Sequence, residues 1–401
     1  MGDHLGPAST RLDGTDSHHM TSETSNDERH SWHLRQIVAV TAVFALIGFG
    51  VSRLSQANGL NLSKAPPELA DLDSRITTPL TSDVSVGIVY DENGLGDGSF
   101  NDSARLGLRA AATNLGIRGN DLALTTDGSA EVLLRRLAAS NNDLVLAIGP
   151  TFDLPVRAVA DDYPLTHFAV IDGSEADSNT PNLGSLHFRV EEGSFLVGAA
   201  AAWKSTGGRI AFLGDERSEI QRRHEAGFVA GARHVDPTVE IEVAYLDLLR
   251  DPEPEAVGHR AMKLYGDGAD IVYYIPPNWA QPVLESAREF SGRRGSGDGA
   301  LDPETKVWAI GTDFDHFGNA GPVLAPHVLT SMIKRADVAV YNTALAVDEA
   351  TFLPEPTTLD LAVDGVGYST SGGFIEDIVT DLEKLKAQII KGEIVVPRVG
   401  E

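Results

Sequence analysis

The chain has 401 residues, enough for two domains and a tail, and 32 Lys and Arg against 58 Asp and Glu give a formal net charge of −26. Such an acidic chain argues against a nucleic-acid partner, which requires basic side chains to neutralise phosphates. The absence of cysteine excludes disulfides, thiolate catalysis and cysteine-ligated metals, and the 12 His show no metal-ligand spacing, so we expect neither a metal nor a cofactor.

The first 82 residues divide into three parts. Residues 1–35 are polar and are expected to be disordered. Residues 36–57 contain the uncharged run Ile37–Val51, which is typical of a membrane anchor or of a signal peptide cleaved after Ser55 to Ala57. The long tail before this run favours the anchor, and either interpretation puts the rest of the chain outside the cytoplasm. Residues 58–82 are expected to be a linker.

The stretch that follows the linker predicts a strand, a glycine-rich loop and a helix. Val84–Tyr90 is apolar and rich in β-branched residues, and helix-forming residues begin near Asn101. In open α/β sheets, ligands bind beyond the carboxyl ends of the strands. Asp91, Phe100 and Asn101 stand at such an end, where Phe100 would offer a stacking face to a planar ligand. The alternatives are turn formation for Asp91 and hydrophobic packing for Phe100.

Strand-like and helical segments alternate through the rest of the chain. Further strands are expected at Leu122–Thr125, Asp143–Ile148, His167–Asp172, Leu183–Phe188, Arg209–Leu213, Val239–Leu246, Ile271–Ile275, Val307–Ile310 and Ile394–Pro397. Helices are expected at Ala130–Ala139, Leu154–Asp161, Glu191–Trp203, Ile220–Val235, Pro254–Tyr265, Pro282–Gly292, Ala336–Ala350 and Ile375–Lys391. The alternation predicts an α/β protein with parallel sheets covered by helices on both faces, and its spacing also suits a single (β/α)₈ barrel.

Three more charged residues stand at strand ends. Asp172 ends one expected strand, Asp313 follows another, and Lys334 follows the apolar segment LTSMI. Strand-end carboxylates from separate βα units converge in one crevice, where they can accept hydrogen bonds from sugar hydroxyls. Turn formation for the two acids and a surface position for the lysine are the alternatives.

No catalytic motif accompanies these residues. The sequence has no Gly-x-Ser-x-Gly elbow, no GKS or GKT phosphate loop and no H-E-x-x-H. We therefore expect a binding protein and not an enzyme, although clustered aspartates would also suit a hydrolase.

Several segments, in order, resemble the basic membrane protein family, the purine nucleoside receptor-like substrate-binding proteins of ABC importers. They are GDGSFND, HFAVIDG, LHFRVEEGSFLVGAAAA, IAFLGDE, GFVAGA, VWAIGTDFD, LTSMIKRADVAVY and IIKGEIVVP, within residues 83–398. The resemblance implies a type I periplasmic-binding-protein fold, with two doubly wound parallel-sheet lobes joined by a hinge. Residues 83–187 and 312–348 would form lobe 1, and 188–311 and 349–401 lobe 2.

The resemblance implies extracytoplasmic binding of a nucleoside, with a purine expected, by hinge closure of the two lobes. The ligand would then be delivered to an ABC permease. Phe100 would stack on the base, and Asp91, Asn101 and Asp172 would make polar contacts to base or sugar. Asp313, assisted by Lys334, would accept hydrogen bonds from the ribose. A membrane-tethered sensor of a nucleoside or sugar-like ligand, without a transport role, is the alternative.

The sequence departs from the family pattern in four places. There is no cysteine for a lipid anchor, so the apolar run of 36–57 would replace it or the protein would be secreted. Gly98 replaces the lysine of the D-K-S-F-N box, and Leu248-Leu249 replace an aromatic. The glycine-rich loop is replaced by IPPNWAQ, whose Trp279 is a candidate for the second stacking face.

Overall fold

The computed structural model describes residues 82–96, 98–125, 128–174, 180–246, 253–294 and 306–399. The expected disordered tail, the anchor or signal segment and nearly all of the expected linker lie outside these residues. A bilayer needs about 20 apolar residues in one helix. None of the helices in the described part of the chain combines that length with that hydropathy.

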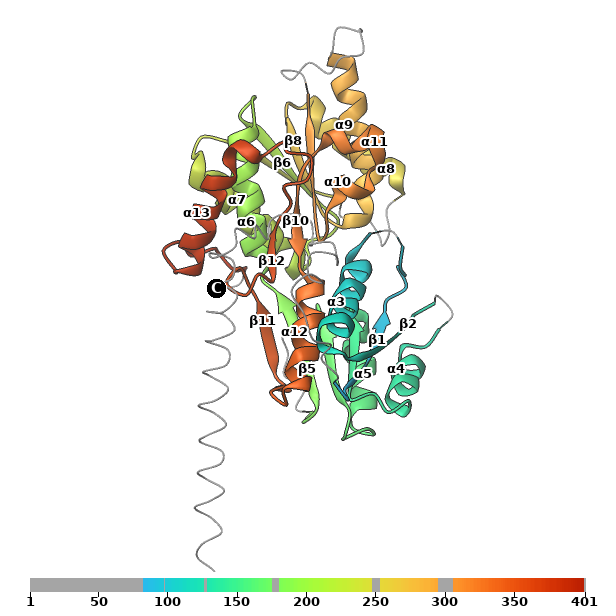
Figure 1. The fold of residues 1–401 in the computed structure, drawn as a ribbon. Coiled ribbons are helices and arrows are strands. Elements are labelled where there is room, and N and C mark those ends of the chain that lie inside the picture. The colour runs from blue at the N-terminus through green and yellow to red at the C-terminus, as the bar shows by residue number, and fades with distance from the viewer. Residues whose placement is uncertain are drawn as a thin grey trace, which may run out of the picture. The chain divides into compact units, whose positions relative to one another are not determined.

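The first sheet is entirely parallel, in the order β11-β5-β4-β3-β1-β2. Its strands are β1 (Ser85–Tyr90), β2 (Arg118–Ala123), β3 (Leu144–Ile148), β4 (His167–Ile171), β5 (Leu183–Phe188) and β11 (Pro356–Leu359). The helices of this lobe are α3 (Phe100–Leu115), α4 (Ala130–Ala139), α5 (Asp153–Ala160) and α12 (Ala336–Asp348). Every residue of β3, LVLAI, is buried, as expected for a central strand with helices on both faces (Figure 1).

The second sheet has the order β12-β10-β9-β8-β6-β7, with only β12 antiparallel to its neighbour. Its strands are β6 (Arg209–Gly214), β7 (Glu240–Tyr245), β8 (Ile271–Tyr274), β9 (Trp308–Gly311), β10 (Val328–Lys334) and β12 (Val366–Tyr368). Its helices are α6 (Val190–Lys204), α7 (Glu219–Val235), α8 (Pro254–Gly266), α9 (Ala280–Arg294), α10 (His316–Asn319), α11 (Gly321–Leu324) and α13 (Val379–Ile390). Short 3₁₀ turns lie at Pro150–Phe152, Pro277–Trp279, Ala325–His327 and Glu376–Ile378. Two separate sheets exclude the barrel and confirm the two-lobe α/β fold.

The lobe boundaries differ from the expected ones in two places. β10, inside 312–348, pairs with β9 in the second sheet, and β11, inside 349–401, pairs with β5 in the first. β11 has four residues, PTTL, of which only Leu359 is buried. So short and polar a segment has no apolar alternation that would predict a strand. Ile394–Pro397, expected to be a strand, is irregular.

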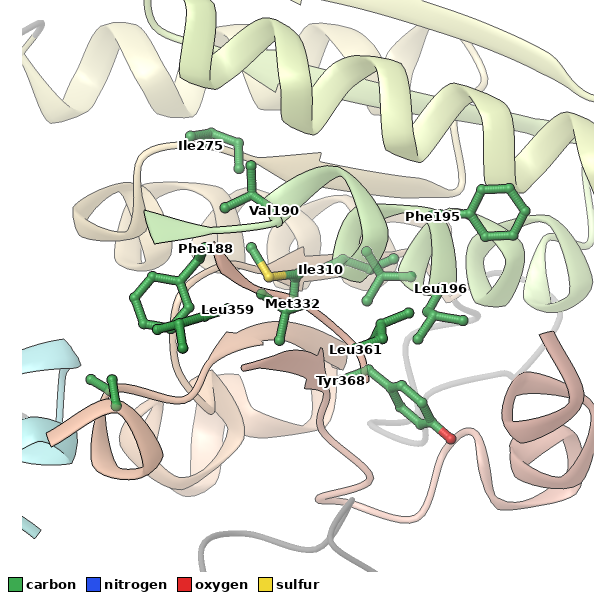
Figure 2. Close-up of a cluster of buried hydrophobic side chains, with 14 of the residues drawn as sticks. Phe188, Val190, Phe195, Leu196, Ile275, Ile310, Met332, Leu359, Leu361 and Tyr368 are labelled. Carbon is green, nitrogen blue, oxygen red and sulfur yellow. The ribbon is translucent and has the colours of Figure 1, made fainter. Parts of the chain in front are cut away.

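The chain passes between the sheets at three places: after β5, after β10 and between β11 and β12. These segments are tied to each other, because Arg189 N donates to Leu359 O at 2.9 Å and Arg335 N donates to Gly365 O at 2.8 Å. Leu361 N donates to the buried Glu192 carboxylate at 3.0 Å. Figure 2 shows the apolar side chains gathered around these passages, among them Phe188, Val190, Met332, Leu359 and Leu361. The hinge region is therefore packed with apolar side chains as well as hydrogen-bonded.

Helix α6 begins directly after the first passage and is buried on all sides from Val190 to Ala202. It packs closely on α7, because a side chain at Gly231 would run into the carbonyl of Phe195. Glu191, in its first turn, is 1% exposed and accepts from Arg223 at 2.8 and 3.0 Å and from Arg398 at 3.2 Å. The start of the second lobe is thus fixed by a buried ion cluster.

Candidate ligand-binding site between the lobes

Lys334, at the end of β10, joins carboxylates from both lobes. Its Nζ lies 2.9 Å from Asp172 Oδ2, beyond β4 of the first lobe, and 3.3 Å from Asp313 Oδ1, beyond β9 of the second. The lysine side chain is 6% exposed, and the two aspartates are 23% and 18% exposed. The strand-end convergence expected from the sequence is therefore present for these three residues, which we call the Lys334 cluster.

Phe100 lies against the same cluster. The centre of its ring is 5.7 Å from Lys334 Nζ, within the range of a cation–π contact. Phe188, at the end of β5, packs edge-on against this ring with centroids 5.8 Å apart. The edge contact restrains the ring of Phe100, which remains only partly buried. The sequence analysis did not single out Phe188, whose signal was its place at the end of an apolar strand.

Both aspartates of the cluster have left-handed backbone conformations, with φ of 64° at Asp172 and 70° at Asp313. Aspartate tolerates this region better than most residues do, at a local cost of about 1–3 kcal/mol. Non-glycine residues held in that region concentrate at functional sites. Asn141, Ala350 and Asp364 share this conformation, so it is compatible with turn formation, and the contacts to Lys334 are what set Asp172 and Asp313 apart.

The charges within the cluster are coupled. Burial acts to lower the pKa of Lys334, but the adjacent charges of Asp172 and Asp313 outweigh it and raise that pKa above its ordinary value. Burial raises the pKa of Asp313, and the charge of Lys334 opposes this shift. One ammonium between two carboxylates leaves a polar group of formal charge −1, suited to hydroxyls and unsuited to further anions.

Asp91 and Asn101 form a second polar group at the end of β1. Asn101 is 2% exposed, and its Nδ2 donates to Asp91 Oδ1 at 2.7 Å and to Gly94 O at 2.9 Å. Asp91 also accepts from Asn93 N at 3.0 Å, as in a side-chain-closed turn. Asp91 therefore does form a turn, as the alternative interpretation expected. Oδ1 of Asn101 is buried and has no hydrogen-bond partner among the described residues.

Trp279 lies elsewhere. Its side chain is 4% exposed and belongs to the core cluster that β8 shares with α8 and α9 in the second lobe. The free energy gained by burying this large apolar ring beneath the start of α9 favours the core position over a position facing the cleft. Trp279 therefore supplies no second stacking face beside Phe100, and Leu248-Leu249 lie outside the described residues.

The lobes also touch near the Lys334 cluster. Asn319, at the end of α10, donates from Nδ2 to Gly98 O of the first lobe at 3.1 Å. Gly98 has φ of 70°, and a Cβ at this position would collide with the Asn319 amide. The site therefore accommodates glycine where the family box has lysine.

A cavity of about 160 Å³ lies beside the cluster. Asp313, Phe314 and Lys334 line it, together with the exposed face of α3 near Asp102 and with β12 near Tyr368. Of the expected site residues only Asp313 and Lys334 border it. Small-molecule sites usually measure about 300–1,000 Å³, so this cavity is smaller than a typical ligand site. Within the described ranges, no three His, Asp or Glu side chains are grouped as metal ligands would be.

Comparison with known proteins places this chain in one class, the substrate-binding proteins of ABC transporters. The family model described as ABC transporter substrate-binding protein PnrA-like (Bmp) matches residues 84–399. The chain belongs to this family, which confirms the resemblance seen in the sequence. The class binds small molecules, works with an ABC transporter and is not a class of enzymes.

Two relatives and one structure illustrate the similarity. The CD4+ T-cell-stimulating antigen of Listeria monocytogenes is 29% identical over 337 residues, covering 79% of this chain and 89% of the relative. The ABC transporter nucleoside-binding protein BmpA of Lactococcus lactis is 28% identical over 329 residues, covering 79% and 90%. A solute-binding protein of Aeropyrum pernix superposes with a TM-score of 0.61 at 24% identity over 79% of this chain and 94% of that one, which shows the shared fold.

Proposed function

We propose that the protein binds a nucleoside, purines included, between its two lobes and delivers it to an ABC permease. The observation that carries the proposal is the Lys334 cluster, in which carboxylates from both lobes meet one lysine beside a restrained aromatic ring. Phe100 would stack on the base, and Asp313 and Lys334 would hold ribose hydroxyls. Asp172 and the free Oδ1 of Asn101 would complete the polar contacts.

The small volume of the cavity, about 160 Å³, supports binding by hinge closure. A larger ligand would fit only after the lobes separate, which would break the contact between Asn319 and Gly98 and that between Lys334 and Asp172. Ligand contacts to both lobes would then favour closure, because only differential contact shifts a conformational equilibrium. The Lactococcus lactis relative is named as a nucleoside-binding protein, which supports the same ligand class.

Calorimetric titration of the full-length protein, purified in detergent, with purine and pyrimidine nucleosides tests the proposal. We expect binding, reduced at least tenfold in Phe100→Ala and in Asp313→Asn. Asp377→Asn, an exposed aspartate paired with Lys204, is the matched control and should bind as wild type. If no nucleoside binds, the ligand assignment fails. Chromatography of the recovered ligand separates binding from hydrolysis, since a binding protein returns it unchanged.

The apolar run of 36–57 would anchor the protein with its binding lobes outside the cytoplasm. Mass spectrometry of the mature N-terminus tests this directly. A retained N-terminus in the membrane fraction supports the anchor, and a new N-terminus after Ala57 contradicts it. Co-purification of a permease would favour transport over a membrane-tethered sensor.

A further inference from the structure

The ring of Phe100 contacts a cation and an aromatic ring that belong to different lobes. Lys334 Nζ lies 5.7 Å from the centre of the Phe100 ring, and Phe188 packs against that ring with centroids 5.8 Å apart and planes at 80°. Lys334 ends β10 of the second sheet, whereas Phe188 ends β5, in the same sheet as β1. Lobe opening would therefore carry the lysine away and leave Phe188 beside the ring.

Phe188 is held firmly in the first lobe. It is 1% exposed, it pairs with Leu359 across β5 and β11, and the next residue, Arg189, donates from N to Leu359 O at 2.9 Å. Figure 2 shows its ring beside Leu359 in the apolar cluster at the hinge. A side chain packed in such a core keeps one rotamer, so Phe188 is a rigid support.

Phe100 depends on a support of this kind. The backbone before it is fixed, because the Asp102 carboxylate accepts from Gly96 N at 2.8 Å and from Gly98 N at 2.7 Å. These bonds do not reach the Phe100 ring, which is only partly buried and is oriented by the side chains that pack against it. A ring that must be ordered on binding costs affinity, and a preorganised ring avoids that cost.

We propose that Phe188 is a positioning residue that holds the Phe100 ring ready to stack on the ligand before the lobes close. That the stacked group is a nucleoside base rests on the proposed function, whereas the support of the ring does not. Phe188 acts through its nearly perpendicular contact with Phe100, an arrangement that aromatic rings prefer. Leucine at position 188 would fill much of the same space without an aromatic edge or face, so the Phe100 ring would gain freedom.

The first test needs no ligand. Carbon-13 relaxation of labelled phenylalanine rings in the ligand-free protein, with Phe100 assigned from Phe100→Leu, should show an ordered Phe100 ring in wild type. Its motion should be about five- to tenfold faster in Phe188→Leu, because the edge contact is lost. Phe188→Met, whose adaptable side chain fills the same space, should give a smaller increase and serves if the leucine variant does not fold.

Phe212→Leu is the matched control for this measurement. Phe212 is fully buried and packs against Tyr273 in an equivalent contact, with centroids 5.8 Å apart and planes at 76°, in the core of the second lobe. This variant should lose stability as Phe188→Leu does and leave the motion of the Phe100 ring unchanged. A Phe100 ring that moves as in wild type in both position-188 variants overturns the proposal.

The second test uses ligand. In calorimetric titration of the full-length protein, Phe188→Leu should bind a purine nucleoside about three- to tenfold more weakly, and Phe212→Leu should bind it as wild type does. In a Phe100→Leu background, Phe188→Leu should cause no further loss, because the ring it positions is absent. Additive losses would indicate a general weakening of the lobe and contradict the proposal. If wild type binds no nucleoside, the proposed function fails, and the relaxation measurement still decides the role of Phe188.

Discussion

Two buried ion clusters lie close to the hinge, and they have opposite composition. In the Lys334 cluster one cation stands between two anions, Asp172 and Asp313. In the second, which we call the Glu191 cluster, one anion stands between two cations, Arg223 and Arg398. Both remove charges from water, which is tolerated only when each charge is paired.

The clusters differ in what surrounds them. All members of the Glu191 cluster belong to the second lobe, and both carboxylate oxygens of its 1%-exposed glutamate are occupied. The Lys334 cluster joins the two lobes and borders the cavity, and its aspartates stay partly exposed. Buried charge by itself therefore does not mark a ligand site. The proposed ligand site is distinguished by incomplete burial, a position between the two lobes and an adjacent cavity.

The largest expected effect is on stability, from Glu191→Ala. This change removes the carboxylate that Arg223 and Arg398 share, so a buried positive charge loses its compensating negative charge, and we expect the free energy of unfolding to fall by about 3–5 kcal/mol in urea denaturation. Glu289→Ala, in an exposed pair with Arg293, is the control and should change it by at most about 0.5 kcal/mol. A loss as small as that of the control would mean that the Glu191 cluster does not hold the lobe together.

His316, which follows Asp313 of the Lys334 cluster in the chain, should make the stability of the protein depend on pH. Burial lowers the pKa of His316 to about 4, while its Nε2 contacts Thr312 O at 2.9 Å. Between pH 6.5 and 4, His316 is protonated in the unfolded chain but remains neutral in the folded protein. The free energy of unfolding therefore falls as the pH decreases, by up to about 3 kcal/mol. Below pH 4 the residue is protonated in both states, and this contribution no longer changes. Thermal unfolding should show a weaker acid dependence in His316→Gln, and an unchanged dependence would contradict this origin.

Lys334→Met should convert the Lys334 cluster into a pair of facing carboxylates. At least one aspartate pKa then rises above its value in the unfolded chain, so the variant is stabilised at low pH and loses that stability as pH rises. The deficit relative to wild type should grow from pH 4 to pH 7 and reach about 2 kcal/mol, with ligand binding lost. Urea denaturation at several pH values measures it. A deficit independent of pH would show that the carboxylates do not interact.

The smallest effect is expected at the contact between the lobes. Gly98→Ala would force the Asn319 side chain away, so we expect ligand affinity to fall about two- to fivefold and the radius of gyration in X-ray scattering to rise slightly. Gly94→Ala is the control, because Gly94 has a similar φ of 74° but open space around it. If both variants behave alike, backbone strain and not the lobe contact is responsible.

Much of the fold could be predicted because its strands carry strong local signals. The boundaries of β5, Leu183–Phe188, and of α4, Ala130–Ala139, agree with those expected from the pattern. β11 and β12 could not be predicted, since they are short and depend on partners distant in the chain. Lys334, Asp172 and Asp313 could be grouped from their strand ends, but the wrong placement of Trp279 shows that a conspicuous aromatic near a strand end need not face the ligand.

The sequence alone determined the α/β class, the family and the strand-end residues of the site, because periodicity and ordered segments are properties of neighbouring residues. Only the tertiary structure decided which lobe β10 and β11 join, the ion pairing at Lys334, and the burial of Trp279 in the second lobe. Those depend on contacts between residues far apart in the chain, and no local pattern encodes which distant side chain will face which carboxylate.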